Sequence, residues 1–212
     1  MMKHKLNRLF TFSILSFTLF FFSQHTYAQK QTATEKKNTA AATSNEATDK
    51  AIVIKEQTDA DNLKGSLKGI STGKIGKVNL VINYHSPAVR KRIIWGGLVA
   101  YGQVWVTGAH SATTLETNST IKFGGKAIPA GKYALFTIPG EKEWVIILNK
   151  NWEQHLADEY SQKDDVIRVT VKPQKTDKPQ ERLRYVVKST GADKGTLEIQ
   201  WEKLRIPVPV TL

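Results

Sequence analysis

A period-two alternation of apolar and polar residues is the feature of this sequence that most constrains its fold. The alternation is clear at 78–84 (VNLVINY), at 182–188 (RLRYVVK) and at 197–202 (LEIQWE). Successive side chains of an extended strand point to opposite faces, so each run has one largely apolar face and one more polar face. This pattern is typical of antiparallel sheets that pack one face on a core and leave the other in water.

Further strands are expected where shorter apolar runs are separated by turn residues such as Gly124-Gly125. We therefore predict an all-β fold, an antiparallel two-sheet sandwich of about nine strands. Pro207 and Pro209 lack the amide hydrogen that a central strand donates, so the last strand is expected at a sheet edge. One short helix is expected at 151–160. The further expected strands are 113–117, 120–123, 132–138, 143–149, 166–172 and 204–212.

The first residues form a pattern typical of a secretion signal. Basic residues precede an apolar stretch at 9–22, and the small residue Ala28 ends the segment. An apolar stretch of about 14 residues is short for a membrane span, which needs roughly 20. We therefore predict a signal peptide at 1–28, cleaved after Ala28, and an exported protein that is periplasmic or extracellular.

The segment 29–50 contains no aromatic residue and no Leu, Ile or Val. Such a segment cannot bury enough apolar surface to offset the entropy lost on ordering, so we predict a disordered linker there. The remaining residues, 51–212, are predicted to form one β-sandwich domain. No run in this part is long and apolar enough to suggest a transmembrane segment in the mature chain.

The absence of cysteine limits the reactions open to the protein, and its net charge limits the partners expected for it. The chain has no Cys, which excludes disulfides, thiol catalysis and cysteine-ligated metals. Its formal net charge is +12. Outside the cytoplasm, we expect such a protein to meet an anionic glycan, an envelope surface or a protein partner rather than nucleic acid. A solvated surface with excess lysine remains an alternative explanation of the charge.

The densest group of unusual residues follows the pattern SPxVxxRxIWGxLVxYGxVWxTGAxxAT, here Ser86 through Thr113. With the stretch IPAGKYALFTIPGEKEWVIILNKNWEQH and the terminal WEKLRIPV, it resembles a family of secreted bacterial proteins catalogued as a domain of unknown function. The resemblance implies no activity, cofactor or substrate. Many relatives have Arg and Asn where this chain has Val106 and His110, which implies that any shared site is altered here.

The same stretch is rich in glycine, which predicts a structured loop over one end or edge of the sandwich. Loops on a rigid sandwich commonly carry binding residues. Its aromatic side chains have two open interpretations, a stacking surface for a sugar or peptide, or a plug that closes the end of the sandwich. The candidate ligand-binding residues are Arg92, Trp95, Tyr101, Trp105 and His110.

Three histidines remain after the predicted signal, and they suggest an alternative site. His85, His110 and His155 together with Asp158 would suit a divalent metal, and a helix at 151–160 would place Asp158 and Glu159 on the face of His155. No HExxH or similar spacing is present, so no cofactor is expected.

The leading functional hypothesis is a non-catalytic module of the envelope or the extracellular space that binds a glycan, peptide or protein. One alternative is a metal-dependent hydrolase that uses His85, His110 and His155. The other is a structural component of the envelope. The sequence leaves these alternatives open.

Overall fold

The computed structural model describes residues 50–212, which form two antiparallel sheets and one short 3-10 helix. The predicted signal peptide at 1–28 lies outside the described residues, as does the predicted linker apart from Lys50. In the described part, no helix has the length and apolar character needed to span a membrane. The all-β sandwich predicted from the alternation is confirmed.

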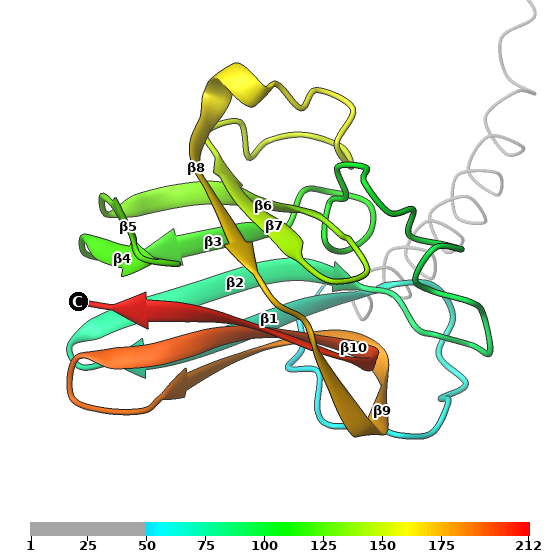
Figure 1. The fold of residues 1–212 in the computed structure, drawn as a ribbon. Coiled ribbons are helices and arrows are strands. Elements are labelled where there is room, and N and C mark those ends of the chain that lie inside the picture. The colour runs from blue at the N-terminus through cyan, green and yellow to red at the C-terminus, as the bar shows by residue number, and fades with distance from the viewer. Residues whose placement is uncertain (1–49) are drawn as a thin grey trace, which may run out of the picture. The chain divides into compact units, whose positions relative to one another are not determined.

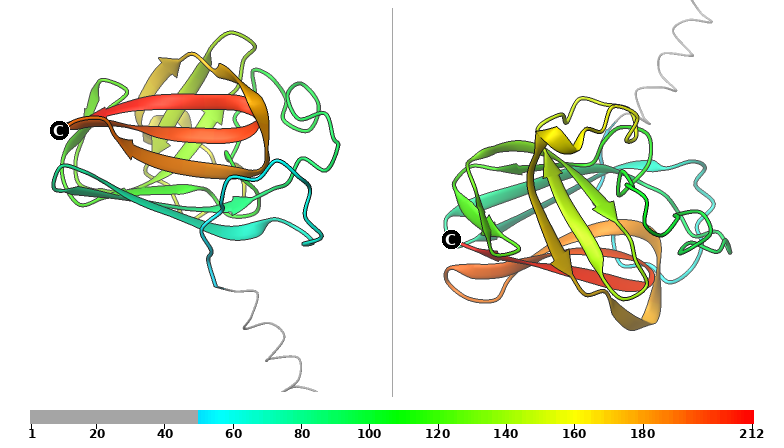
Figure 2. Two further views of the ribbon diagram at one scale, coloured as in Figure 1. Left: turned by 90° about the horizontal axis from the view of Figure 1, so that it is seen from below. Right: turned by 45° about the horizontal axis from the view of Figure 1, so that its top comes forward.

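The larger sheet has six strands in the order β1-β2-β3-β6-β7-β8, and the smaller has four in the order β5-β4-β10-β9. Figures 1 and 2 show the two sheets as facing layers. The strands are β1 (Leu67–Ile75), β2 (Val78–Ser86), β3 (Thr114–Thr117), β4 (Ile121–Phe123), β5 (Lys126–Ile128), β6 (Gly131–Ile138), β7 (Trp144–Asn149), β8 (Asp165–Val171), β9 (Gln174–Ser189) and β10 (Lys194–Thr211).

One apolar core fills the space between the two sheets. The alternation along β2 directs Leu80, Ile82 and Tyr84 into this core, where they join Tyr185 of β9 and Ile199 of β10. Burying a large apolar side chain stabilises the fold by roughly 1.5–3 kcal/mol. The other residues of β2 lie on the opposite face of the larger sheet, so this strand serves both the core and the outer surface.

Strand β1 was not expected from the sequence, because its glycines break the apolar pattern. A Cβ atom on Gly69 would lie 2.7 Å from Cζ of Tyr84, and one on Gly73 would lie 2.4 Å from Cβ of Val187 in β9. The glycines therefore leave space for side chains of the neighbouring strand and of the facing sheet. β1 pairs along its whole length with β2, from Leu67 opposite Ser86 to Ile75 opposite Val78.

The last strand differs from its expected position. β10 joins the two expected strands 197–202 and 204–212, and it lies between β4 and β9 rather than at an edge. β10 pairs with β9 as far as Arg205 and with β4 from Val210 onward. Pro207 falls between these two paired stretches, so its missing amide hydrogen removes no ladder bond there.

The helix expected at 151–160 is not formed. Leu156 has a positive φ of 49°, and its amide donates to the carbonyl of His110 at 2.5 Å. Contact with the neighbouring loop thus replaces the local hydrogen bonds of a helix, and tertiary structure overrides local propensity. The short 3-10 helix η1 (Gln162–Asp164) follows instead.

The glycine-rich segment between β2 and β3 is the structured loop that the sequence predicts. It contains only isolated bridges, such as Trp105 with Thr137 of β6 and Ala88 with Arg182 of β9. The hydroxyl of Tyr185 donates to the carbonyl of Thr107 at 2.6 Å, which fastens the loop to the core. The loop begins where β2 ends and extends beyond the ends of the strands (Figure 1).

Candidate functional site

The two tryptophans of the predicted ligand surface lie in the core. Trp95 and Trp105 pack against Trp144 and Trp201, both of which are fully buried. The ring centroids of Trp95 and Trp144 are 5.0 Å apart, and Trp105 stacks on Trp201 with centroids 5.8 Å apart and planes 19° apart. This packing favours a plug at the end of the sandwich over a stacking surface for these two residues.

The other three predicted ligand-binding residues make contacts of different kinds. Arg92 folds back on its own loop, where its Nη2 donates to the carbonyl of Ala88 at 2.5 Å. Tyr101 is exposed and lies against Gly96. His110 lies beside His85 instead.

The three histidines of the alternative metal site are only partly brought together. The rings of His85 and His110 are 5.1 Å apart between centroids and meet edge to face. His155 lies nearby through a backbone bridge with Ser111, but its Nδ1 contacts Oδ2 of Asp158 at 2.9 Å. Among residues 50–212, no group of three His, Asp or Glu side chains is arranged to hold a metal ion.

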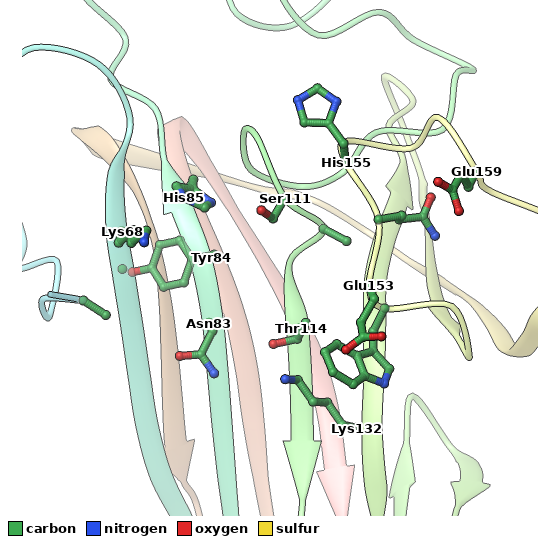
Figure 3. Close-up of a pocket in the computed structure, with 15 residues that line it drawn as sticks. Lys68, Asn83, Tyr84, His85, Ser111, Thr114, Lys132, Glu153, His155 and Glu159 are labelled. Atoms are coloured by element: carbon green, nitrogen blue, oxygen red, sulfur yellow. The ribbon is translucent and has the colours of Figure 1, made fainter. Parts of the chain in front are cut away.

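A pocket of about 520 Å³ lies on the outer face of the larger sheet. Its floor is formed by strands β1, β2, β3 and β6, and one wall is formed by the turns at 151–160 (Figure 3). Strand register sets the floor, since Lys68 lies opposite His85 and Asn83 lies opposite Thr114. The polar side chains that line the pocket include Lys68, Asn83, His85, Ser111, Thr114, Lys132, Glu153, His155 and Glu159.

Two polar atoms that line this pocket lack a hydrogen-bond partner within residues 50–212. They are the hydroxyl of Thr114 and the side-chain oxygen of Gln154, and both are buried. An unpaired buried polar atom costs about 1–3 kcal/mol. The wall therefore favours contact with hydrogen-bonding groups.

Charges of both signs surround the pocket. Lys68 and Lys132 lie on the strands of the floor, whereas Glu153 and Glu159 lie in the turns of the wall. The ammonium of Lys132 is 3.7 Å from the ring centroid of Trp152, a cation–π contact that fixes the lysine at the edge of the pocket.

The imidazole of His85 is held in its neutral form. Partial burial lowers its pKa below the ordinary 6.5, and the neighbouring charges of His110 and Lys68 lower it further. A neutral imidazole has one nitrogen that donates and one that accepts. His85 therefore adds both kinds of hydrogen-bonding group to the pocket at neutral pH.

Sequence reasoning selected the histidines of this site but missed most of its floor. Asn83 and Thr114 were assigned only to strands, and the signal that pointed to them was a polar residue on the outward face of an alternating run. Glu159 was considered only as a possible metal ligand beside Asp158 on the expected helix, and Glu153 was missed.

Comparison with known proteins gives a family but no activity. The model of a family described as a protein of unknown function (DUF2911) matches residues 66–210. No curated protein and no solved structure matches the chain. The matched range includes every strand of the larger sheet and most residues of the pocket.

Proposed function

Since the chain belongs to the DUF2911 family of proteins of unknown function, we propose its role from its own site: an exported, non-catalytic module that binds a neutral glycan unit. The glycan lies in the pocket on the outer face of the larger sheet. Export rests on the signal pattern of residues 1–28.

The floor of the pocket carries this proposal. Asn83 and Thr114 lie side by side on adjacent strands, and within residues 50–212 the side-chain amide of Asn83 makes no hydrogen bond. The Thr114 hydroxyl is likewise unpaired among the described residues. An amide and a hydroxyl on rigid strands provide both donors and acceptors, which is what the hydroxyl groups of a sugar require.

The charges of the pocket favour a neutral ligand over an anionic one. Two lysines on the floor are opposed by Glu153 and Glu159 on the wall, and His85 is neutral. The formal charges of the lining therefore cancel. Carboxylates accept and ammonium groups donate hydrogen bonds, so both can bind sugar hydroxyls without selecting a net charge. The volume of about 520 Å³ is within the usual range of small-ligand pockets.

Isothermal titration calorimetry with neutral sugars tests the proposal. The probes are glucose, galactose, mannose, N-acetylglucosamine and the disaccharide cellobiose. We expect saturable binding of at least one, weakened about tenfold by Asn83→Ala through the loss of one or two hydrogen bonds.

Asn79→Ala provides the matched control. Asn79 is an exposed asparagine on the outward face of the same strand, but it lies outside the pocket. It should leave the affinity unchanged. Equal weakening by both variants, or no binding of any probe, would contradict the proposal. Binding of a charged dipeptide in preference to every sugar would overturn the glycan as ligand.

A further inference from the structure

The loop after β2 presents apolar side chains to solvent at its tip. Ile93 is 78% exposed, Leu98 is 50% exposed and Tyr101 is 39% exposed. They lie close together along the chain, and the backbone amide of Leu98 donates to the carbonyl of Ile93 at 3.0 Å. We call these three residues the apolar tip. Grouped exposure of this kind marks interaction sites more often than scattered apolar residues do.

The apolar tip is held in place by the core beneath it. Ile94 and Val99 are buried, and the amide of Val99 donates to the carbonyl of Ile94 at 2.9 Å. Trp95 anchors the same turn in the tryptophan cluster. Ile93 precedes Ile94 and Leu98 precedes Val99, so each exposed residue is next to a buried one along the chain. The fold therefore keeps Ile93 and Leu98 exposed.

Basic side chains stand next to the apolar tip. Arg90, Lys91 and Arg92 are consecutive and exposed, and the guanidinium groups of Arg90 and Arg92 each donate to a backbone carbonyl, of Leu63 and of Ala88, and keep further donors. Arg90 and Lys91 adopt positive φ values of 46° and 57°, and the Arg90 amide donates to Oε1 of Glu181 at 2.9 Å. This unusual backbone fixes the direction of the basic segment relative to the loop.

We propose that this loop docks the protein on an anionic membrane surface, with the apolar tip in the interfacial region and the basic residues on the lipid headgroups. Protruding aliphatic residues, a tyrosine and adjacent cations are the combination that interfacial binding uses. The loop projects beyond the strands as a convex feature (Figure 2), which suits insertion into a soft surface. This docking is independent of the glycan pocket.

Co-sedimentation with lipid vesicles tests the docking. The chain isolated after export is mixed with vesicles of phosphatidylcholine alone or of phosphatidylcholine with phosphatidylglycerol. We expect binding to the anionic vesicles that weakens as salt is added. The double variant Ile93→Ser/Leu98→Ser should lose at least about tenfold in partitioning. Lys91→Gln should lose about fivefold through one headgroup contact.

Leu212→Ser is the matched control. Leu212 is 43% exposed, comparable to Leu98, and it ends the chain away from the end of β2 (Figure 1). The Leu212→Ser variant should bind the vesicles as well as the unmodified chain does. The unfolding midpoints of all variants should stay close to that of the unmodified chain, because the changed side chains are exposed. Failure of the unmodified chain to bind anionic vesicles, or full binding by the double variant, would overturn the proposal.

Discussion

Across β1, β2 and β3 the two faces of the larger sheet differ in burial and polarity, although the same strands form both. Over β6 and β7 the outer face is also apolar, since Phe136 and Ile147 pack under the loop there. The inner face packs Trp144 and its neighbours into an apolar core. The outer face carries the pocket, with its paired Asn83 and Thr114 and its charges of both signs. The difference teaches that one alternating pattern can specify stability on one face and recognition on the other, because adjacent residues of a strand never share a face.

The segment from Ser86 to Thr113, which follows the family pattern, also contributes to both the core and the pocket. Its first part supplies Trp95 and Trp105 to the core, whereas its last part supplies His110 beside the pocket and Ser111 within it. We therefore expect changes in the first part to affect stability and changes in the last part to affect binding.

The largest expected effect is on the inner face. Trp144→Ala should lower the free energy of unfolding by about 4 kcal/mol, because it removes a fully buried indole that contacts two other tryptophans, Trp95 and Trp105. Urea denaturation followed by circular dichroism measures this loss. Trp152→Ala, on the outer face, is the comparison and should cost less, since Trp152 is only partly buried. Equal losses would remove the distinction between the faces.

A smaller loss of stability is expected from a change next to the buried charge of Arg182. Arg182 is 1% exposed, and its Nη2 donates to Oδ1 of Asp61 at 2.7 Å and to the carbonyl of Leu63 at 2.9 Å. Asp61→Asn should cost about 2 kcal/mol at neutral pH, because the guanidinium loses its charged partner but keeps carbonyl acceptors. Chemical denaturation at neutral pH gives the value.

The same pair predicts a pH dependence. The hydrogen bond from Arg182 holds the pKa of the Asp61 carboxyl well below its usual 3.8. A depressed pKa stabilises the folded state above the unfolded-state pKa, and this contribution is lost as the pH falls below it. The difference in stability between the unmodified chain and Asp61→Asn should therefore shrink below about pH 4. A difference that stays constant down to pH 2 would contradict this role for the pair.

The fold could be predicted from sequence because alternation is a local signal. The alternation within β2 and within β9 identifies the buried face of each strand, and the neighbouring strands are not needed for this. β1 escaped detection because Gly69 and Gly73 are explained only by the side chains packed over them, and these come from other strands.

The pocket could be predicted only in part, because it depends on register and on contacts between distant segments. Asn83 and Thr114 become neighbours only when β2 pairs with β3. The contact between His155 and Asp158 was expected on a helix, yet it forms in a turn held by the loop at His110. The tryptophans of the loop suggested a ligand surface, but only the fold shows that Trp144 and Trp201 surround them.

The smallest expected effect on stability accompanies the most direct test of the site. Asn83→Ala changes a side chain outside the core, so its free energy of unfolding should remain within about 0.5 kcal/mol of the unmodified chain. In ¹H–¹⁵N NMR spectra recorded during titration with the sugar that binds, the largest shifts should occur at Asn83, His85, Ser111 and Thr114. In Asn83→Ala the shifts of the other three residues should appear only at about tenfold higher sugar concentrations. Shifts concentrated on β9 and β10, with the outer face of the larger sheet unaffected, would contradict the assignment of the pocket as the functional site.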